Sequence, residues 1–373
     1  MDALMLPLNW QKVRLGDIGK PCMCKRVMKH QTTRYGEIPF YKIGTFGNTA
    51  DAFISKKLFL EYKTKYSFPK KGDILISASG TIGRAVIYDG KPAYFQDSNI
   101  VWIDNDETLV KNDFLFYAYS NVKWNTEHTT ILRLYNDNFR NTLIPLPPLN
   151  EQSTIANILS GLDRYLCALD ALILKKEGVK KALSFELLSQ RKRLRGFNQA
   201  WQRVRLGDIA NYLISNLSAE QITQQGKIKV YDVNNFIGYT DTTFISDKPY
   251  ISIVKDGSVG RVRILPPKTN ILSTMGALIA NHRTTTEFLF YLLSNFDFKN
   301  FTSGSIIPHI YFKDYKEKAI FLPPLNEQSA IANILSALDN EITSLKNKKR
   351  QFENIKKTLN HDLMSTKIRV LEK

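Results

Sequence analysis

Hydrophobic residues recur with a helical period along two long segments of the chain. Each segment places them in alternating steps of four and three, a spacing that is typical of a coiled-coil seam when it is sustained over about five heptads. The first series is Ile155, Leu159, Leu162, Leu166, Leu169, Ile173, Leu183 and Leu187. The second is Ile331, Leu335, Leu338, Ile342, Leu345, Phe352, Leu359 and Leu363. We therefore predict two long helices that pair with each other. Ordinary amphipathic helices packed on a globular core are the alternative.

The ends of these segments fit helices of roughly 40 residues, each about 60 Å long at 1.5 Å per residue. Adjacent prolines precede each segment and stop a preceding strand, and Asn150 and Asn326 follow as candidate N-caps. Lysines interrupt the apolar seam, and their ammonium groups must either reach solvent or meet an acidic partner. These lysines are Lys176, Lys180, Lys349 and Lys356.

Both segments belong to a larger internal duplication. The octapeptide LPPLNEQS occurs at 146–153 and again at 322–329. WQKVRLGDI at 10–18 returns as WQRVRLGDI at 201–209, and SGTIGR at 79–84 returns as DGSVGR at 256–261. The offset between the copies falls from 191 to 177 between these two motifs, so the second copy is shorter there by 14 residues. The repeat also looks cyclic, and we expect the two ends of the chain to close it in space.

The segment before each long helix predicts a mixed α/β domain, and the chain as a whole an α+β fold. GDILISASGTIGRAVIYDG is typical of two strands joined by a glycine-containing turn. Short buried helices are expected at NDFLFYAYSNV and TEFLFYLLSNF, and a last strand at NTLIPLPP and KAIFLPP. The expected organisation is a first domain at 1–146, a long helix at 147–195, a second domain at 196–322 and a long helix at 323–370.

The net charge indicates a class of partner. The chain has 52 Lys and Arg against 35 Asp and Glu, which gives a formal net charge of +17. A bias of this size favours a polyanion. No apolar run approaches the roughly 18 residues of a membrane span, and the N-terminal residues lack the pattern of a signal peptide. The three cysteines include a C-x-C pair without a nearby histidine, which is poor zinc spacing. We expect a reduced, cytoplasmic protein without a metal.

The order of these motifs resembles the specificity subunits of type I restriction–modification systems. The resemblance covers essentially the whole chain and is most specific at WQxVRLGDI, LPPLNEQSxIANILSxLD and the helix-ending LLSQRKRL and LMSTKIRV. It implies that each domain is a target recognition domain that reads one half of a split, asymmetric site in double-stranded DNA. It also implies that the helices form an antiparallel coiled coil, set the spacer between the half-sites and dock two methyltransferase subunits. S-adenosylmethionine would then be bound by those subunits, and ATP and Mg²⁺ by restriction subunits that act as translocases.

Candidate DNA contacts are basic and amide side chains in the expected loops of both domains. In the first domain they are Lys25, Arg26, Lys29, Arg34, Lys42, Thr45, Arg84, Gln96 and Asn99. In the second they are Asn234, Asn235, Lys255, Arg261, Arg263 and His282. Candidate methyltransferase contacts are Pro148, Asn150, Glu151, Gln152, Pro324, Asn326, Glu327 and Gln328. Gly80 and Gly83 fit turn geometry better than a phosphate cradle, because a lone G-x-x-G is a weak signal.

Two other classes of protein remain as alternatives. A standalone DNA-modifying enzyme would need an N/D-P-P-Y/F segment, and Pro266-Pro267 lacks both flanks. No Walker A sequence is present, which argues against ATP-driven translocation by this chain. A coiled-coil scaffold would explain the helices but neither the duplicated domains nor the charge. Methylation of DNA by this chain alone would favour the enzyme, and a bipartite methylation motif that requires a methyltransferase partner favours the specificity subunit.

Overall fold

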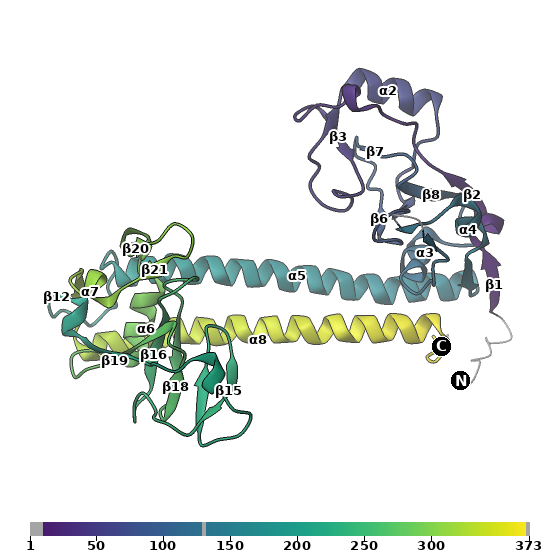
Figure 1. Cartoon of the computed structure of the whole chain (residues 1–373). Helices are drawn as coiled ribbons and strands as arrows, with labels where there is room; N and C mark the ends of the chain where they lie inside the picture. Colours follow the sequence, from purple (N-terminus) through teal and green to yellow (C-terminus); the bar gives the residue numbers. More distant parts are fainter. Residues whose placement is uncertain (1–9, 129–131, 371–373) are drawn as a thin grey trace. The chain divides into compact units, whose positions relative to one another are not determined.

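The computed structural model describes residues 10–128 and 132–370, which form two compact units (Figure 1). The first unit contains the described residues up to Leu169 and those from Lys348 onward, and the second is Asp170–Asn347. Helices α5 (Leu149–Leu188) and α8 (Leu325–Met364) each have 40 residues and pass from one unit into the other. Each unit therefore combines one domain, the start of the helix that follows that domain and the end of the other long helix. The expected organisation placed each long helix in a segment of its own.

The first domain contains two main sheets. The four-stranded sheet has the order β2-β8-β5-β6 and the three-stranded sheet the order β4-β3-β7. The strands are β1 (Gln11–Arg14), β2 (Gly19–Cys22), β3 (Ile38–Tyr41), β4 (Phe53–Ile54), β5 (Ile74–Ser77), β6 (Ala85–Ile87), β7 (Tyr94–Phe95), β8 (Ile100–Asn105), β9 (Glu127–His128), β10 (Leu132–Arg133) and β11 (Leu143–Leu146). The helices are α1 (Leu15–Ile18), η1 (Lys29–Gln31), α2 (Lys56–Lys65), α3 (Asn112–Tyr119) and α4 (Asn136–Asn141).

The second domain repeats this plan. Its four-stranded sheet has the order β13-β19-β16-β17 and its three-stranded sheet the order β15-β14-β18. The strands are β12 (Gln202–Arg205), β13 (Ala210–Ile214), β14 (Ile228–Tyr231), β15 (Phe236–Thr240), β16 (Tyr250–Val254), β17 (Val262–Leu265), β18 (Thr269–Ile271), β19 (Met275–Ala280), β20 (Thr302–Ser303), β21 (His309–Ile310) and β22 (Ala319–Leu322). The helices are η2 (Leu206–Asp208), η3 (Ala219–Gln221), α6 (Thr286–Ser294), η4 (Lys299–Phe301) and α7 (Phe312–Tyr315). The predicted strand pairs, short helices and last strands are thus present in both domains.

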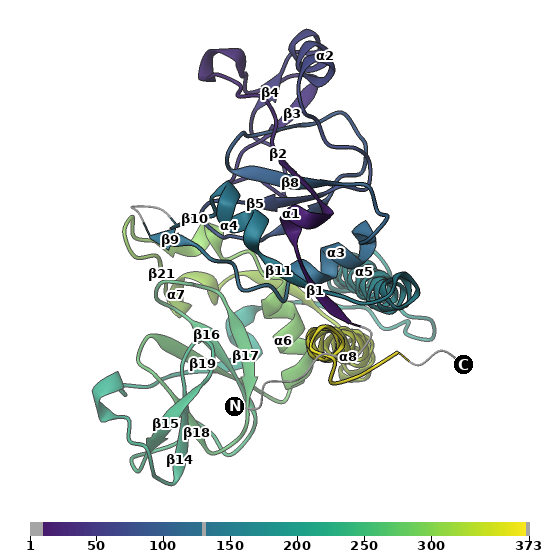
Figure 2. The same cartoon turned by 90° about the vertical axis from the view of Figure 1, so that its right-hand side faces the viewer.

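The side chains of the central strands point alternately to the two faces of the sheet, so the interior of each domain is divided into two cores. In β8, Val101 and Ile103 face a core shared with α3 and α5, whereas Trp102 faces the core next to the three-stranded sheet. Successive side chains of a strand point to opposite faces, so a strand that is buried on both faces needs apolar residues throughout. Figure 2 shows α3 between the four-stranded sheet of the first domain and the start of α5.

The end of each long helix completes the core of the domain in its own unit. Leu359, Leu363 and Met364 of α8 pack into the first core together with Trp10, and Val370 lies against the same cluster. The equivalent residues Leu183, Leu187 and Leu188 of α5 pack into the second core with Trp201, next to Leu194. The predicted cyclic closure is therefore confirmed for the described residues.

Within each unit the two long helices pair in antiparallel fashion. In the first unit Asp163 contacts Lys356, and the ring centroids of Tyr165 and Phe352 are 4.7 Å apart. In the second unit Lys176 lies 2.8 Å from Glu341, and Lys180 pairs with Asp339. Lys349 contacts Glu353 on its own helix. All four lysines that interrupt the seam thus have acidic partners, which is one of the two outcomes that the sequence left open.

The predicted seam residues at the start of each long helix also belong to a domain core. Ile155 and Leu159 of α5 lie in the first core, which also contains Leu363 of α8. Ile331 and Leu335 of α8 lie in the second core, which also contains Leu187 of α5. One detail of the helix prediction was wrong, because the helices begin at Leu149 and Leu325, one residue before the expected caps. Of the helices in the described part of the chain, none combines the length and hydropathy needed to cross a bilayer.

Candidate nucleic-acid interfaces

The repeated octapeptide forms the joint between each domain and its long helix. Trp10 Nε1 donates to Glu151 Oε2 at 2.9 Å, and Trp201 Nε1 donates to Glu327 Oε2 at 3.0 Å. Glu327 is fully buried and also accepts from Arg193 Nη2 at 2.7 Å. The Trp motif and the octapeptide therefore recur together because they bond to each other.

The glutamine of the octapeptide binds backbone on both sides of this joint. Gln152 Nε2 donates to the carbonyls of Leu109 and Pro147, and its Oε1 accepts from Lys111 N at 2.8 Å. Gln328 makes the matching contacts with the carbonyls of Arg283 and Pro323 and with Thr285 N. Each glutamine fixes the loop that leads into the short buried helix of its domain.

These contacts change the set of residues that can meet a methyltransferase. Gln152, Glu327 and Gln328 are each 0% exposed, so their side chains serve the interior and do not reach a partner's surface. The remaining candidates are at least partly accessible: Pro148, Asn150, Glu151, Pro324 and Asn326. The sequence did not separate the buried face of this segment from its exposed one, and docking by the exposed face stays a prediction.

Three loops meet at one edge of the first domain and bring several predicted DNA contacts together. Arg84 Nη1 donates to Phe46 O at 3.0 Å, and Gln96 Oε1 accepts from Ile43 N at 3.0 Å. Asn99 Oδ1 accepts from Ser79 Oγ at 2.8 Å. Residues 42–48, 79–84 and 96–99 thus form one hydrogen-bonded surface, which we call the first-domain edge.

The other predicted residues of this domain lie on or beside this edge. Lys42 is the first residue of the loop 42–48. Its Nζ contacts Asp51, and its backbone N–H donates to Thr45 Oγ1. Arg26 Nε lies 2.8 Å from Asp97 and ties the loop 25–34 to the edge. Lys25, Lys29 and Arg34 extend from that loop and are exposed. Thr45, Gln96 and Asn99 hold the loops in place, whereas the exposed Lys25, Lys29 and Arg34 stay predicted DNA contacts.

The second domain forms a corresponding edge from the loops 231–235, 255–263 and 272–274. Arg263 Nη1 donates to Asn234 O at 3.0 Å, and its guanidinium lies 5.2 Å from the centroid of Tyr231. The backbone N–H groups of Asn234 and Asn235 both donate to Asp232 Oδ1, which leaves their exposed amides at the tip of the turn. Lys255 and Arg261 bound the glycine loop between β16 and β17.

His282 does not belong with this group. It follows β19 at Ala280, whereas the second-domain edge lies at the other end of that strand, where Val254 pairs with Met275. Its neighbour Arg283 instead contacts the joint through Gln328. Proximity in sequence to the basic loops was therefore misleading for this residue.

The glycines of the turn motif allow a positive φ and the close approach of an aromatic side chain. Gly83 has a φ of +81°, and a Cβ there would lie 2.1 Å from Trp124 Nε1. Gly260 has the same φ, and its Cβ would lie 2.6 Å from the Phe298 ring. Turn geometry, as expected, accounts for this motif. Among the described residues no cluster of His, Cys, Asp and Glu is arranged to hold a metal ion.

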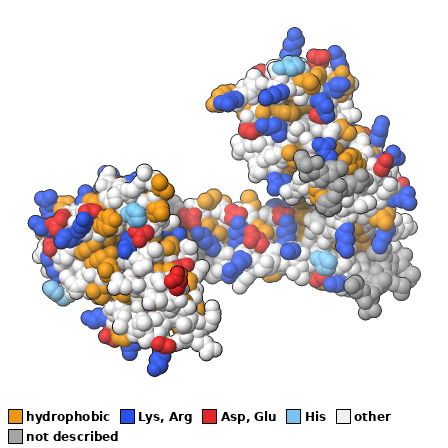
Figure 3. Space-filling model, in the orientation of Figure 1, with side chains coloured by type: hydrophobic (Ala, Val, Ile, Leu, Met, Phe, Trp, Pro, Cys, Tyr) orange, Lys and Arg blue, Asp and Glu red, His pale blue; other side chains and the backbone are white. Residues whose placement is uncertain are grey.

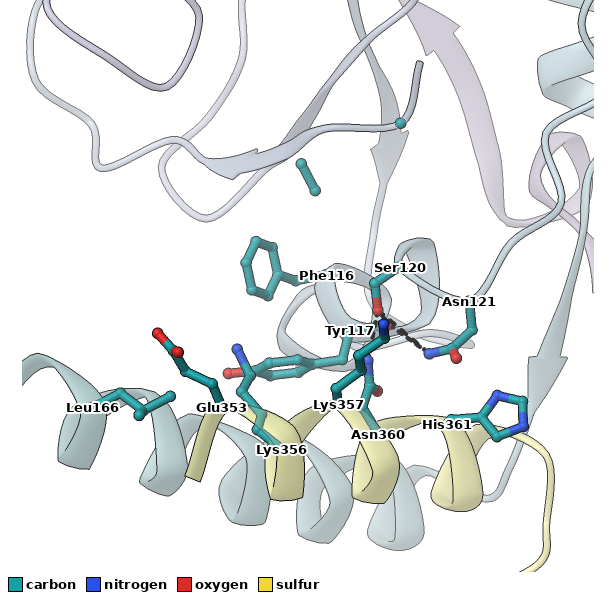
Figure 4. Close-up of a pocket in the computed structure, with 12 residues that line it drawn as sticks. Phe116, Tyr117, Ser120, Asn121, Leu166, Glu353, Lys356, Lys357, Asn360 and His361 are labelled. Carbon is teal, nitrogen blue, oxygen red and sulfur yellow. Dashed lines mark hydrogen bonds between the residues drawn. The ribbon is translucent and has the colours of Figure 1, made fainter. Parts of the chain in front are cut away.

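Sequence reasoning missed a side-chain triad that occurs once in each unit. Tyr117 Oη donates to Asp163 Oδ2 at 2.7 Å, and Lys356 contacts the same carboxylate and the Tyr117 ring. Figure 4 shows Tyr117 of α3 beside Lys356 of α8, at a cavity of about 870 Å³. Burial, and then the hydrogen bond to the carboxylate, raise the pKa of the Tyr117 hydroxyl, so it remains a donor.

The second unit repeats this triad as Tyr291, Asp339 and Lys180, with Tyr291 Oη donating to Asp339 Oδ2 at 2.9 Å. Each triad joins a short domain helix to both long helices. Because the three residues are far apart in sequence, only their retention in both copies of the repeat signals a role.

Comparisons with known proteins agree with this architecture. The family model for the type I restriction modification DNA specificity domain matches residues 7–176 and again 198–354. A putative type I restriction enzyme specificity subunit of Haemophilus influenzae is 64% identical over 152 residues, which are 40% of each chain. The putative type I restriction enzyme MjaX specificity subunit of Methanocaldococcus jannaschii is 30% identical, over 98% of this chain and 95% of that protein.

Solved structures show the same fold. The crystal structure of the S subunit of a type I restriction–modification system from M. genitalium has a TM-score of 0.64 at 20% identity and covers 96% of this chain and 98% of that one. A chain from a type I restriction–modification system studied for its complex assembly has a TM-score of 0.59 at 18% identity, with 98% and 99% covered. With both copies of the repeat matched along most of their length, the chain belongs to the family of type I restriction–modification DNA specificity proteins.

Proposed function

We propose that the chain is the non-catalytic subunit that selects the DNA sequence for a type I restriction–modification complex. The single observation that carries this proposal is the pair of similarly built units whose joints are the same and whose edge loops differ. The first-domain edge presents Arg84 and Lys42, and the second presents Arg263 with the Asn234-Asn235 turn. Each edge would read one half of a bipartite, asymmetric site, because base readout depends on side-chain identity.

The paired helices would set the spacer between the half-sites. One heptad lengthens a helix by about 10 Å at 1.5 Å per residue. That length corresponds to roughly three base pairs at about 3.4 Å each. Inserting one heptad into both α5 and α8 should therefore lengthen the spacer by roughly that amount and leave both half-sites unchanged. An unaltered spacer would contradict this role of the helices.

The surface that would dock two identical methyltransferase subunits must occur twice. The first three turns of α5 and α8 carry such a surface, because their exposed residues are identical in the two copies and only the half-buried pair Thr154 and Ala330 differs, although the edge loops have diverged. We call it the retained stripe: Leu149, Asn150, Ser153, Asn157 and Ile158 in α5, and Leu325, Asn326, Ser329, Asn333 and Ile334 in α8. Leu149 and Leu325 are 41% and 47% exposed and Ile158 is 38% exposed, so the stripe combines apolar side chains with amides and a hydroxyl.

Co-expression with the neighbouring methyltransferase and a genome-wide map of adenine methylation test the reading function. A bipartite motif that disappears without this chain supports the proposal. Methylation by this chain alone would instead favour a standalone enzyme.

Docking is tested separately in the same co-expression system. Asn157→Glu with Asn333→Glu should abolish co-purification of the methyltransferase while DNA sequence preference is kept. Ala168→Glu with Ser344→Glu is a matched control at exposed positions that differ between the copies. If the double variant loses its DNA sequence preference but still co-purifies with the methyltransferase, the retained stripe contacts DNA and not the methyltransferase.

The chemistry of modification and restriction would then lie in the partner subunits. S-adenosylmethionine would be bound by the methyltransferase subunits, and ATP and Mg²⁺ by the restriction subunits. The lack of the N/D-P-P-Y/F and Walker A motifs in the sequence supports this division. The three free cysteines fit a reducing cytoplasm.

A further inference from the structure

Helix α2 distinguishes the first recognition domain from the second. After β4 the first domain forms this ten-residue helix, whose N-cap Ser55 accepts from Leu58 N. At the same place the second domain passes from β15 to β16 through residues 241–249 without a helix. This difference is part of the length that the second copy lacks. The fold does not require α2, since the second domain forms the same two sheets without it.

The segment that contains α2 is strongly basic. Residues 55–73 carry six lysines against Glu61 and Asp73, whereas residues 241–249 carry Lys248 against Asp241 and Asp247. Only Phe59 of α2 is buried in the domain. The helix therefore contributes one anchor to the core and presents most of its charge to solvent.

Local acidic groups neutralise only part of this charge. Glu61 is held by Lys65 Nζ at 3.0 Å, and Lys70 Nζ lies 2.9 Å from Asp104. The ammonium groups of Lys56 and Lys57 form no hydrogen bond or ion pair with the described residues, and both side chains are exposed. Two cations at the start of a helix face the positive end of its dipole, which is unfavourable unless an anion lies nearby.

The basic loop 25–34 packs against the same helix. Lys25 Nζ lies 5.0 Å from the centroid of Tyr66, and Gln31 Nε2 donates to Tyr62 Oη at 3.4 Å. Through the contact of Arg26 with Asp97, this surface is continuous with the first-domain edge. Figure 3 shows Lys and Arg side chains gathered over the part of the first domain that carries α2.

We infer that α2 and the loop 25–34 form a second DNA contact, which binds backbone phosphates that flank the half-site read by the first domain. This inference rests on the proposed function. Phosphates are favoured over bases because all the cations of α2 are lysines, compact point charges that lack the planar fork with which arginine matches base edges. Lysine binds phosphate as a point charge. The first domain then covers more DNA than the second, whatever sequence each one reads.

The test measures how DNA binding by the full chain, assembled with its methyltransferase, depends on salt. The probe is a duplex that carries the mapped methylation motif. Lys56→Ala with Lys57→Ala should reduce the slope of log K against log salt by about 1.8, since each phosphate contact contributes about 0.9. The methylated motif should not change. Alanine maintains the helix, and Lys248→Ala in the corresponding loop of the second domain is the control that should leave the slope unchanged.

Hydroxyl-radical footprinting supplies a second measurement. The double variant should lose protection only beside the half-site of the first domain. An unchanged slope, lost protection beside the other half-site or an altered motif would each overturn the inference. If the unsubstituted complex shows no preference for the motif-bearing duplex, the proposed function itself fails, and that outcome is distinct from these three.

Discussion

Arg193 offers a sharp test of the joint between the second domain and α8. Its guanidinium binds both oxygens of Glu327, with Nε at 3.2 Å from Oε1 and Nη2 at 2.7 Å from Oε2. The Glu327 side chain is fully buried, whereas that of Arg193 is 27% exposed. Arg193→Met removes the cation and leaves the carboxylate with the Trp201 indole. Breaking a buried pair in this way costs about 3–5 kcal/mol, because the remaining charge is not compensated.

Thermal unfolding of the purified chain checks this magnitude. For a unit of this size about 1 kcal/mol shifts Tm by roughly 2–4 °C, so Arg193→Met should lower the Tm of the second unit by roughly 6–20 °C. Adding Glu327→Gln removes the buried charge and should restore a large part of the loss, a non-additivity that a double-mutant cycle measures. A Tm drop of only about 2 °C or less, or a double variant as unstable as the single one, would refute the reasoning.

Three further outcomes are expected. Gly83→Ala forces a positive φ on alanine and brings its Cβ against Trp124, so it should lower the free energy of unfolding by about 1–3 kcal/mol or more, as measured in urea. Gly161→Ala in α5 meets open space and should raise the same quantity by about 0.5–1 kcal/mol, and a destabilised variant would contradict this. In the native state a maleimide should label the exposed Cys167 quickly and leave Cys24 unlabelled, because burial raises the pKa of Cys24 to about 12; mass spectrometry of brief reactions would show either result.

The architecture could be predicted from the sequence, because the duplication and the apolar spacing are visible in the order of residues alone. The lysines at seam positions could be restricted in advance to two outcomes, since a cation in a helix interface must be neutralised or reach solvent. The spacing could not distinguish Ile155 and Leu159, which pack into a domain, from Leu169, which follows them in the same register. Both environments select the same residue types, so only tertiary contacts separate them.

The candidate site was less predictable. The edge loops meet through backbone groups, as in the bonds from Arg84 to Phe46 O and from Ile43 N to Gln96, and side-chain identity gives no sign of such bonds. Glu327 looked like a surface residue because glutamate usually is one, yet it is buried by Trp201 and Arg193 from distant parts of the chain. The lysines of α2 were not among the predicted DNA contacts, and nothing in the sequence indicated that they lie beside the loop 25–34.

The packing of Leu359, Leu363 and Met364 into the first core has a consequence for synthesis of the protein. The first domain needs residues that are synthesised after the whole second domain before its interior can close. Until α8 has been synthesised, the nascent chain must keep an apolar surface beside Trp10 exposed, which makes this domain a natural client for chaperones. A nonsense codon shortly before Leu359 would thus damage the first domain as well, although that domain is encoded far upstream.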